Sequence, residues 1–172
     1  NSSNGSFKAY EHSTITIGNS GAVSNPLTGV STEGSSLEFM NLKIPSGVTQ
    51  NISSSFKIKG DLEVEGNLSC SSGTISIVGS NQQKIIGSNS PDFFSIILNN
   101  PNGLFLENSI VFANGGAGVL QLDNGDIDLG GNNTITMSTS SATLIESAGN
   151  HILNSKKSDG GSTGGFIVSS SI

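Results

Sequence analysis

The chain has 172 residues, of which Ser (32), Gly (23) and Asn (19) together make up about 43%. Charged residues are 12%, aromatic residues are 5%, Trp and Arg are absent, and the formal net charge is −6. This composition excludes a coiled coil or helical bundle, which needs many Ala, Glu, Lys and Leu residues. It also argues against nucleic-acid binding and against a membrane-spanning segment. The lysines provide no basic surface for nucleic acid, and no apolar run is long enough to span a membrane.

Composition also bears on the cellular compartment. The segment Asn1–Gly5 has neither the basic start nor the apolar stretch of a secretory signal peptide. Cys70 is the only cysteine, so no intramolecular disulfide can form, and we expect its side chain to be a small buried hydrophobic group. The low charge, the absence of Arg and the abundance of Ser, Thr and Asn favour an extracellular location at a bacterial cell surface.

Short segments of alternating apolar and polar residues predict β-strands with one buried face. The clearest, in chain order, are Phe56–Lys59, Leu62–Glu65 and Val119–Leu122. Asp92–Leu98 fits either the start of a helix or a buried strand, and no other segment suggests a helix. Ser155–Gly165 has no apolar side chain to bury and is expected to be a loop, after which Phe166–Val168 returns to strand.

Clusters of Gly, Asn and Ser separate these segments. Asn and Gly tolerate the positive φ that tight corners require, so the clusters predict turns. They lie at Gly66–Asn67, Ser71–Gly73, Asn99–Gly103, Asn114–Gly116 and Gly130–Asn133. Short strands with a corner at intervals of about 8–12 residues indicate an all-β fold.

The sequence repeats itself at long range. Thr14–Ile17 recurs as Thr74–Ile77 and as Thr134–Met137, with a spacing of about 60 residues both times. Between these anchors, residues 37–47 match 93–103 at an offset of 56, and residues 62–67 match 120–125 at an offset of 58. We therefore expect residues 1–172 to be one segment cut from a larger chain. Its repeats of about 60 residues would span residues 14–73, 74–133 and, in part, 134–172.

Two all-β architectures fit this pattern. In a parallel β-solenoid, or β-helix, each long repeat would make about three coils of roughly 20 residues, with the apolar residues stacked in columns inside. The alternative is an antiparallel β-sandwich. The recurrence of the same apolar cluster favours the solenoid. A solenoid also explains the many Asn residues, whose side chains can form hydrogen-bonded ladders at the corners.

Three segments carry a resemblance to a known family. They are Gly79–Gly87 (GSNQQKIIG), followed by Phe94–Gly103 (FSIILNNPNG), and Leu122–Met137 (LDNGDIDLGGNNTITM). This pattern resembles the repeats of very large secreted surface proteins of Bacteroidota. The resemblance covers residues 37–145 and implies an adhesin-like or filament-like stalk with parallel β-helix repeats. It implies no catalytic residue. Ser95 departs from the family, which usually has Asn there, and no C-terminal sorting domain is recognisable.

Few residues suggest a catalytic or metal-binding role. Asp123, Asp126 and Asp128 could offer oxygens to Ca²⁺. In a strand, however, Asp126 and Asp128 would share one face while Asp123 lies across a turn, so turn formation and solubility explain them better. Glu63 and Glu65 are interpreted as the solvent-facing side of a strand. His12 and His151 are far apart in sequence and match no zinc or catalytic-triad pattern.

We therefore expect no catalytic, cofactor-binding or metal-binding residues and no cofactor. The sequence predicts a non-catalytic structural or adhesive module of a bacterial cell-surface or extracellular filament protein. Its expected partners are copies of itself, neighbouring repeats of a larger protein and surface glycans. One alternative is a carbohydrate-binding or polysaccharide-cleaving β-helix, and a second is an ice-binding solenoid. Against the second, the Thr-x-Thr pairs recur only once in each long repeat instead of once per coil.

Overall fold

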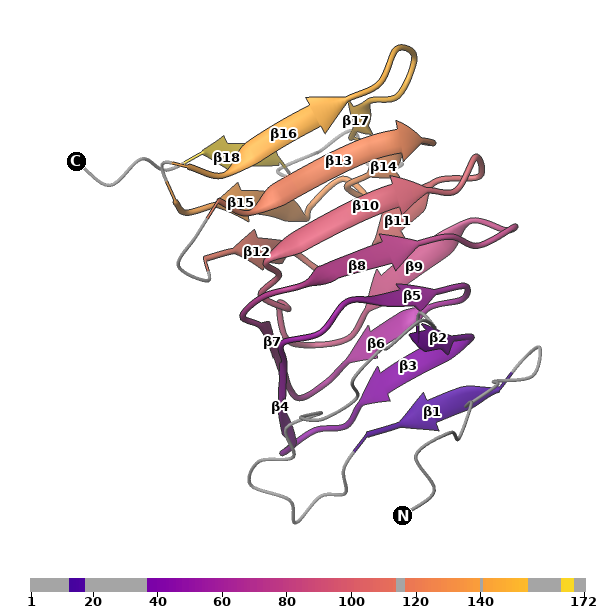
Figure 1. The fold of residues 1–172 in the computed structure, drawn as a ribbon, viewed down its shortest axis with the longest axis vertical. Helices are drawn as coiled ribbons and strands as arrows, with labels where there is room; N and C mark the ends of the chain where they lie inside the picture. Colours follow the sequence, from indigo (N-terminus) through magenta and orange to yellow (C-terminus); the bar gives the residue numbers. More distant parts are fainter. Residues whose placement is uncertain (1–12, 18–36, 114–116, 140, 155–164, 169–172) are drawn as a thin grey trace.

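The computed structural model describes residues 13–17, 37–113, 117–139, 141–154 and 165–168. Within these residues there is no helix, and all strand pairings are parallel. The strands stack in coils along one axis and form a β-solenoid of about five turns (Figure 1). The predicted fold class is confirmed, and the β-sandwich, which requires antiparallel pairing, is wrong.

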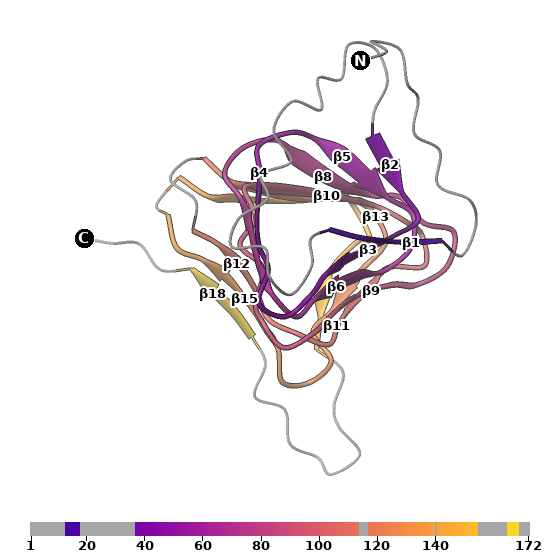
Figure 2. The ribbon, with the colours of Figure 1, turned by 90° about the horizontal axis from the view of Figure 1, so that it is seen from below.

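Three faces surround the core, and Figure 2 shows them along the axis. Face A contains, in order, β1 (Thr14–Thr16), β3 (Asn41–Ile44), β6 (Leu62–Val64), β9 (Gln83–Ile86), β11 (Leu104–Leu106), β14 (Ile127–Asp128) and β17 (Ile152–Leu153). Face B contains β2 (Leu37–Phe39), β5 (Phe56–Ile58), β8 (Thr74–Ile77), β10 (Ser95–Asn99), β13 (Val119–Asn124) and β16 (Thr143–Glu146). Face C contains β4 (Thr49–Ile52), β7 (Asn67–Cys70), β12 (Ile110–Phe112), β15 (Thr134–Met137) and β18 (Gly165–Val168).

The chain visits faces A, C and B in turn and then starts the next coil. On face C, β7 and β12 are linked by isolated bridges from Ser69 to Asp92 and from Asp92 to Val111. Paired residues on face A mark the length of a coil, because Leu62 lies beside Leu42 on one side and Ile85 on the other. The spacing between coils is about 23 residues.

The long-range sequence similarity does not follow this structural period. Thr14–Thr16 forms β1 on face A, Thr74–Ile77 forms β8 on face B, and Thr134–Met137 forms β15 on face C. The spacing of these segments lies between two and three coils, so each copy falls on a different face. The copies resemble one another because all three faces impose the same rule of inward apolar and outward polar residues.

Inward side chains form continuous apolar columns. One column on face B runs Phe56–Ile75–Ile96–Leu120–Leu144, and a second runs Phe39–Ile58–Ile77–Leu98–Leu122. All of these except Leu144 are buried. Burial of each such side chain stabilises the fold by about 1.5–3 kcal/mol relative to exposure, so the columns hold the coils together.

The predicted details of the strands hold where the structure describes them. The alternation in Phe56–Lys59, Leu62–Glu65 and Val119–Leu122 places the apolar side chains inward, except Val119, which is half-buried and alternates with buried Leu120 and Leu122. Asp92–Leu98 is not helical and leads into β10, and the strand predicted at Phe166–Val168 is part of β18. Residues 114–116 and 155–164, predicted as turn and loop, lie outside the described residues.

Cys70 is buried in the inward column of face C, as predicted. It pairs with Ile52 on the preceding coil, and only 2% of its surface is exposed. Burial raises the pKa of its thiol to about 12, with a smaller contribution from the negative charge of Asp92. The thiol is therefore protonated at neutral pH and behaves as a small hydrophobic group.

Candidate functional site

Two buried amide side chains form a polar hub at the corner between faces B and A. Gln83 Oε1 accepts a hydrogen bond from the Gly79 N–H at 2.5 Å. Gln83 Nε2 donates to the carbonyl oxygens of Ile58 at 3.1 Å and Gly60 at 2.5 Å, both on the preceding coil. Gln83 is 2% exposed, so it satisfies backbone groups that water cannot reach.

Asn100 extends the hub to the following coil. Its Nδ2 donates to Gln83 Oε1 at 3.0 Å and to the Asn81 carbonyl oxygen at 2.7 Å, and its Oδ1 accepts from the Asn102 N–H at 3.0 Å. Three successive coils are thus joined through two side chains. Their donors and acceptors are used within the protein, so the hub has a structural role.

The hub explains why glycine stands at position 79. A Cβ at Gly79 would lie 2.6 Å from both Gln83 Oε1 and the Lys59 carbonyl oxygen, so a larger residue cannot replace it without rearrangement. Neither Gln83 nor Asn100 was expected from the sequence to have a special role. A signal was present for Gln83, because the alternation in Gln83–Ile86 places Gln83 on the same side as buried Ile85.

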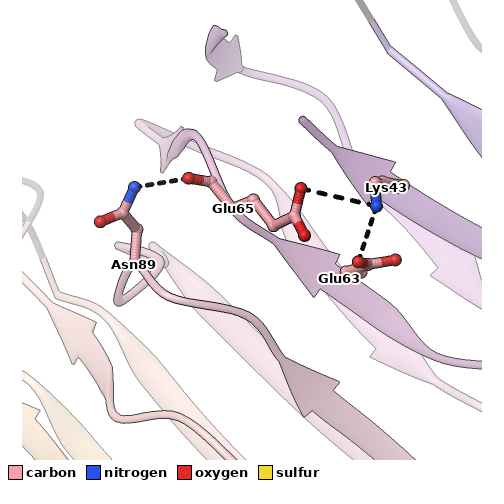
Figure 3. A network of polar contacts seen from close by, with 4 residues as sticks. All are labelled: Lys43, Glu63, Glu65 and Asn89. Carbon is pink, nitrogen blue, oxygen red and sulfur yellow. Dashed lines mark hydrogen bonds and ion pairs between the residues drawn. The ribbon is translucent and has the colours of Figure 1, made fainter. Parts of the chain in front are cut away.

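The outer surface of face A carries ion pairs between coils, shown in Figure 3. Lys43 Nζ lies 2.7 Å from Glu63 Oε1 and 3.5 Å from Glu65 Oε2, both on the next coil. Asn89 Nδ2, one coil further on, donates to the backbone carbonyl oxygen of Glu65 at 2.7 Å. Glu63 and Glu65 lie on the solvent side of the strand as predicted, but their pairing with Lys43 was not foreseen.

The other described lysines form the same kind of contact. Lys84 Nζ lies 2.7 Å from Glu107 Oε1 on the next coil and 5.8 Å from the centre of the Phe105 ring. Lys57 and Lys59 both contact Glu38 on the preceding coil, at 3.7 and 2.8 Å. All these pairs link neighbouring coils along the axis. Because the groups are exposed, each pair contributes little on its own.

Asparagine ladders at the corners differ in detail from the prediction. Among the described residues, the side chains donate mainly to backbone carbonyl oxygens of the preceding coil. Side-chain-to-side-chain bonds between coils also occur, from Asn100 to Gln83 Oε1 and from Asn67 to Thr49 Oγ1. Asn89 donates to Gly66, Asn108 to Asn89, Asn133 to Leu106 and Asn150 to Asp123. Backbone carbonyls at a corner have no strand partner, so the amide satisfies an acceptor that each coil leaves open.

The three aspartates considered for Ca²⁺ have separate partners. Asp123 Oδ1 accepts from Gln121 Nε2, Asp126 Oδ1 from the His151 N–H, and Asp128 Oδ1 from the Gly130 N–H. The residues that the structure describes contain no group of three or more His, Cys, Asp or Glu side chains arranged to hold a metal ion. The carboxylates serve turns and coil contacts. His12 lies outside the described residues.

Two surface features bear on the alternative functions. The described Thr-x-Thr segments lie on different faces, so they do not form the regular threonine array expected of an ice-binding face. Four of the described phenylalanines are buried, but Phe105 faces outward between inward-facing Leu104 and Leu106. Phe94 is also half-buried. The Phe105 ring differs in having the Lys84 Nζ 5.8 Å from its centre, and a half-buried outward ring is the kind of feature that an aromatic platform for a sugar requires.

Comparison with known protein families, curated proteins and solved structures finds no match to this chain. The fold and its contacts therefore carry the functional argument. In the described part of the chain, no helix is long and apolar enough to cross a membrane.

The ion pairs predict how stability depends on pH. The hydrogen bond from Lys59 lowers the pKa of Glu38 below 4.5, and hydrogen bonds to Glu63 and Glu107 raise the pKa values of Lys43 and Lys84 above 10.5. The Glu38 contribution is complete above pH 4.5 and is lost as pH falls through the lowered pKa. The lysine contributions are complete below pH 10.5 and are lost as pH rises through the raised values.

We therefore expect the urea midpoint of unfolding to fall below pH 4.5 and at alkaline pH. Buried Cys70 adds to the alkaline loss above pH 9.0, because its thiol loses its proton more readily in the unfolded chain. The double variant Lys43→Gln, Lys84→Gln separates these effects, since it should decline less at alkaline pH than the unaltered protein. An equal decline in both proteins would show that the lysine pairs do not stabilise the coils.

Proposed function

We propose that this chain is a non-catalytic structural or adhesive module of an elongated protein at a bacterial cell surface or in an extracellular filament. One observation carries the proposal: the polar side chains of the described residues are used mainly between coils. The described ion pairs join neighbouring coils, and Gln83 and Asn100 connect three coils through buried hydrogen bonds. Such contacts resist separation of the coils along the axis, as an extended stalk requires.

The state of the charged side chains supports the same assignment. The described lysines are engaged with carboxylates, and the aspartates suggested for Ca²⁺ are occupied by backbone or amide donors. A catalytic site needs titratable groups that converge on a reacting atom and remain able to contact it. The resemblance of Gly79–Gly103 to Bacteroidota surface repeats supports an extracellular role of this kind.

Localisation in the source cells tests this proposal. Antibodies raised against the purified chain should label intact, unpermeabilised cells or the filaments sheared from them, and external protease should abolish the signal. Labelling only after permeabilisation would overturn the proposed location. A cytosolic protein of known location, probed in the same samples, controls for leakage.

A carbohydrate-active domain is the alternative with a specific observation in its favour, the outward ring of Phe105. A glycan array and a polysaccharide hydrolysis assay on the purified chain address it. The structural proposal predicts no turnover. Turnover that is lost in Phe105→Ala but retained in Phe94→Ala would overturn the non-catalytic assignment in favour of the carbohydrate-active one.

A further inference from the structure

Two asparagine–glycine pairs lie in the described part of the chain, Asn102–Gly103 and Asn124–Gly125. Each pair forms a corner between faces B and A, both asparagines are exposed, and the glycines have positive φ angles of 78° and 95°. An asparagine followed by glycine is prone to deamidation, because glycine has no side chain to obstruct attack by its backbone nitrogen on the asparagine amide. The two corners carry the same reactive pair, so their surroundings decide which one reacts.

The corner at Asn102 is held from several sides. Asn102 Nδ2 donates to the Ser80 carbonyl oxygen at 2.8 Å, which fixes the side chain to the preceding coil. The Gly103 N–H donates to the Asn100 carbonyl oxygen at 2.8 Å, and the Gly103 carbonyl oxygen accepts from the Gln83 N–H at 3.1 Å. Asn100 and Gln83 are the two residues of the buried hub. Release of the Gly103 N–H therefore requires the hub corner to open.

At the second corner, the Gly125 N–H is held by one side chain from an exposed turn. It donates to Asn150 Oδ1 at 2.9 Å, and Asn150 Nδ2 donates back to the Asp123 carbonyl oxygen at 3.1 Å. Residues 147–149, which precede Asn150, are exposed. These residues bury no apolar side chain, so opening of the turn would free the Gly125 N–H without exposing the hydrophobic core.

We propose that Asn124 is a site of spontaneous deamidation and that Asn150 restrains the reaction. When the turn opens, the Gly125 nitrogen attacks Cγ of Asn124. An N–Cγ bond forms, the Cγ–Nδ2 bond breaks, and the amide leaves as ammonia with the proton of the Gly125 N–H. Water then opens the cyclic imide, at Cγ to give aspartate or at the backbone carbonyl carbon to give isoaspartate. Because local opening is fast relative to this chemistry, the rate follows the population of the open corner.

The products alter contacts between coils. Isoaspartate lengthens the backbone by a methylene group at the point where the Asn124 carbonyl oxygen accepts from the Asn100 N–H at 2.9 Å. The corner has little room for this change, because even a Cβ at Gly125 would overlap the Asn100 carbonyl oxygen. Either product also adds a carboxylate to a segment that already contains Asp123 and Asp126, and like charges repel. Reaction at Asn124 therefore loosens the contact between the coils that contain β10 and β13.

Mass spectrometry of the unaltered full chain tests the proposal. The folded chain is incubated at mildly alkaline pH and then cleaved after glutamate, which places Asn102 and Asn124 on separate peptides, residues 66–107 and 108–146. Fragment ions locate the change from amide to carboxylate. We expect Asn124 to react at least about tenfold faster than Asn102 in the folded chain, and the difference should disappear in urea. A difference that persists in urea, or a folded chain in which Asn124 reacts no faster than Asn102, would overturn the proposal.

Two variants test the role of Asn150. Asn150→Ala removes the hydrogen bonds that hold the corner and should raise the rate at Asn124 about tenfold. The rate at Asn102 in the same molecules should not change, which reports that the variant remains folded. Asn108→Ala is the matched control, because Asn108 Nδ2 donates to the Asn89 carbonyl oxygen at a different corner, and it should change neither rate. An unchanged rate at Asn124 in Asn150→Ala, or an equal acceleration at Asn102, would contradict the restraining role of Asn150.

Discussion

Replacing Gln83 with Leu should destabilise the solenoid by about 3–5 kcal/mol, a large effect for one substitution. The Leu side chain is close in size but cannot form hydrogen bonds. It would leave the Gly79 N–H and the Gly60 carbonyl oxygen without their partner in a buried corner. The Ile58 carbonyl oxygen and the Asn100 amide would each lose one hydrogen bond but keep another, from the Val78 N–H and to the Asn81 carbonyl oxygen. Each buried polar group that loses its partner costs about 1–3 kcal/mol, and partial relaxation of the corner reduces the sum.

The neighbouring residue provides a matched control. Gln82 is the same residue type, lies next to Gln83 and is exposed. Gln82→Leu should therefore change the free energy of unfolding by no more than about 0.5 kcal/mol. Urea unfolding followed by far-UV circular dichroism measures both variants. Equal stability of the two would mean that the hub does not hold the three coils together.

Replacing Gly125 with Ala should destabilise the protein by about 3 kcal/mol, for two separable reasons. Gly125 has a φ of 95°, a left-handed conformation that costs a residue with a Cβ about 1–2 kcal/mol. Its Cβ would also overlap the carbonyl oxygen of Asn100 on the preceding coil. Neither backbone segment can move without disturbing the corner, because the Gly125 N–H also donates to Asn150 Oδ1 at 2.9 Å.

A substitution at Gly149 separates the cost of backbone strain from the cost of steric overlap. It has a similar φ of 88°, but a Cβ there would meet no atom within 4 Å. Gly149→Ala should therefore cost only the conformational strain, about 1 kcal/mol, while Gly125→Ala also carries the steric cost. The difference between the two urea midpoints isolates the close approach of successive coils. Similar losses in both variants would show that the corner relaxes and that coil spacing is not fixed there.

Both predictions concern coil-to-coil contacts, which also carry the functional proposal. A solenoid unit contacts only its neighbours, so its stability depends on nearest-neighbour interfaces. The hub at Gln83 and the close approach at Gly125 lie at corners between faces B and A, where the chain leaves one strand ladder for the next. A chain that extends along one axis needs such contacts between every pair of neighbouring coils.

The local sequence pattern was sufficient to predict much of the fold. Alternation in segments such as Leu62–Glu65 showed which side chains point inward, because successive side chains of a strand lie on opposite sides. Gly and Asn clusters marked the corners, and the recurrence of apolar clusters favoured a solenoid over a sandwich. The burial of Cys70 also followed from residue type alone. These features depend on interactions between near neighbours in sequence.

Long-range register was not available from the same pattern. The anchors Thr14–Ile17, Thr74–Ile77 and Thr134–Met137 suggested that equivalent segments stack, yet they lie on three different faces. A pattern with a period of two residues is identical on every face, so it cannot show which strands are neighbours. The number of residues in each coil decides which strands are neighbours. That number depends on how each corner packs against the preceding coil.

Residue type and order were thus enough to specify an all-β chain with inward apolar columns, outward polar residues and corners of Gly and Asn. The contacts between residues of different coils could be identified only from the folded structure. Folding paired Lys43 with Glu63 and Glu65, and it brought Gln83 to Asn100 and to the backbone of the preceding coil. Strand alternation is a local steric property, whereas each of these contacts joins residues about one coil apart, so local pattern could predict the first but not the second.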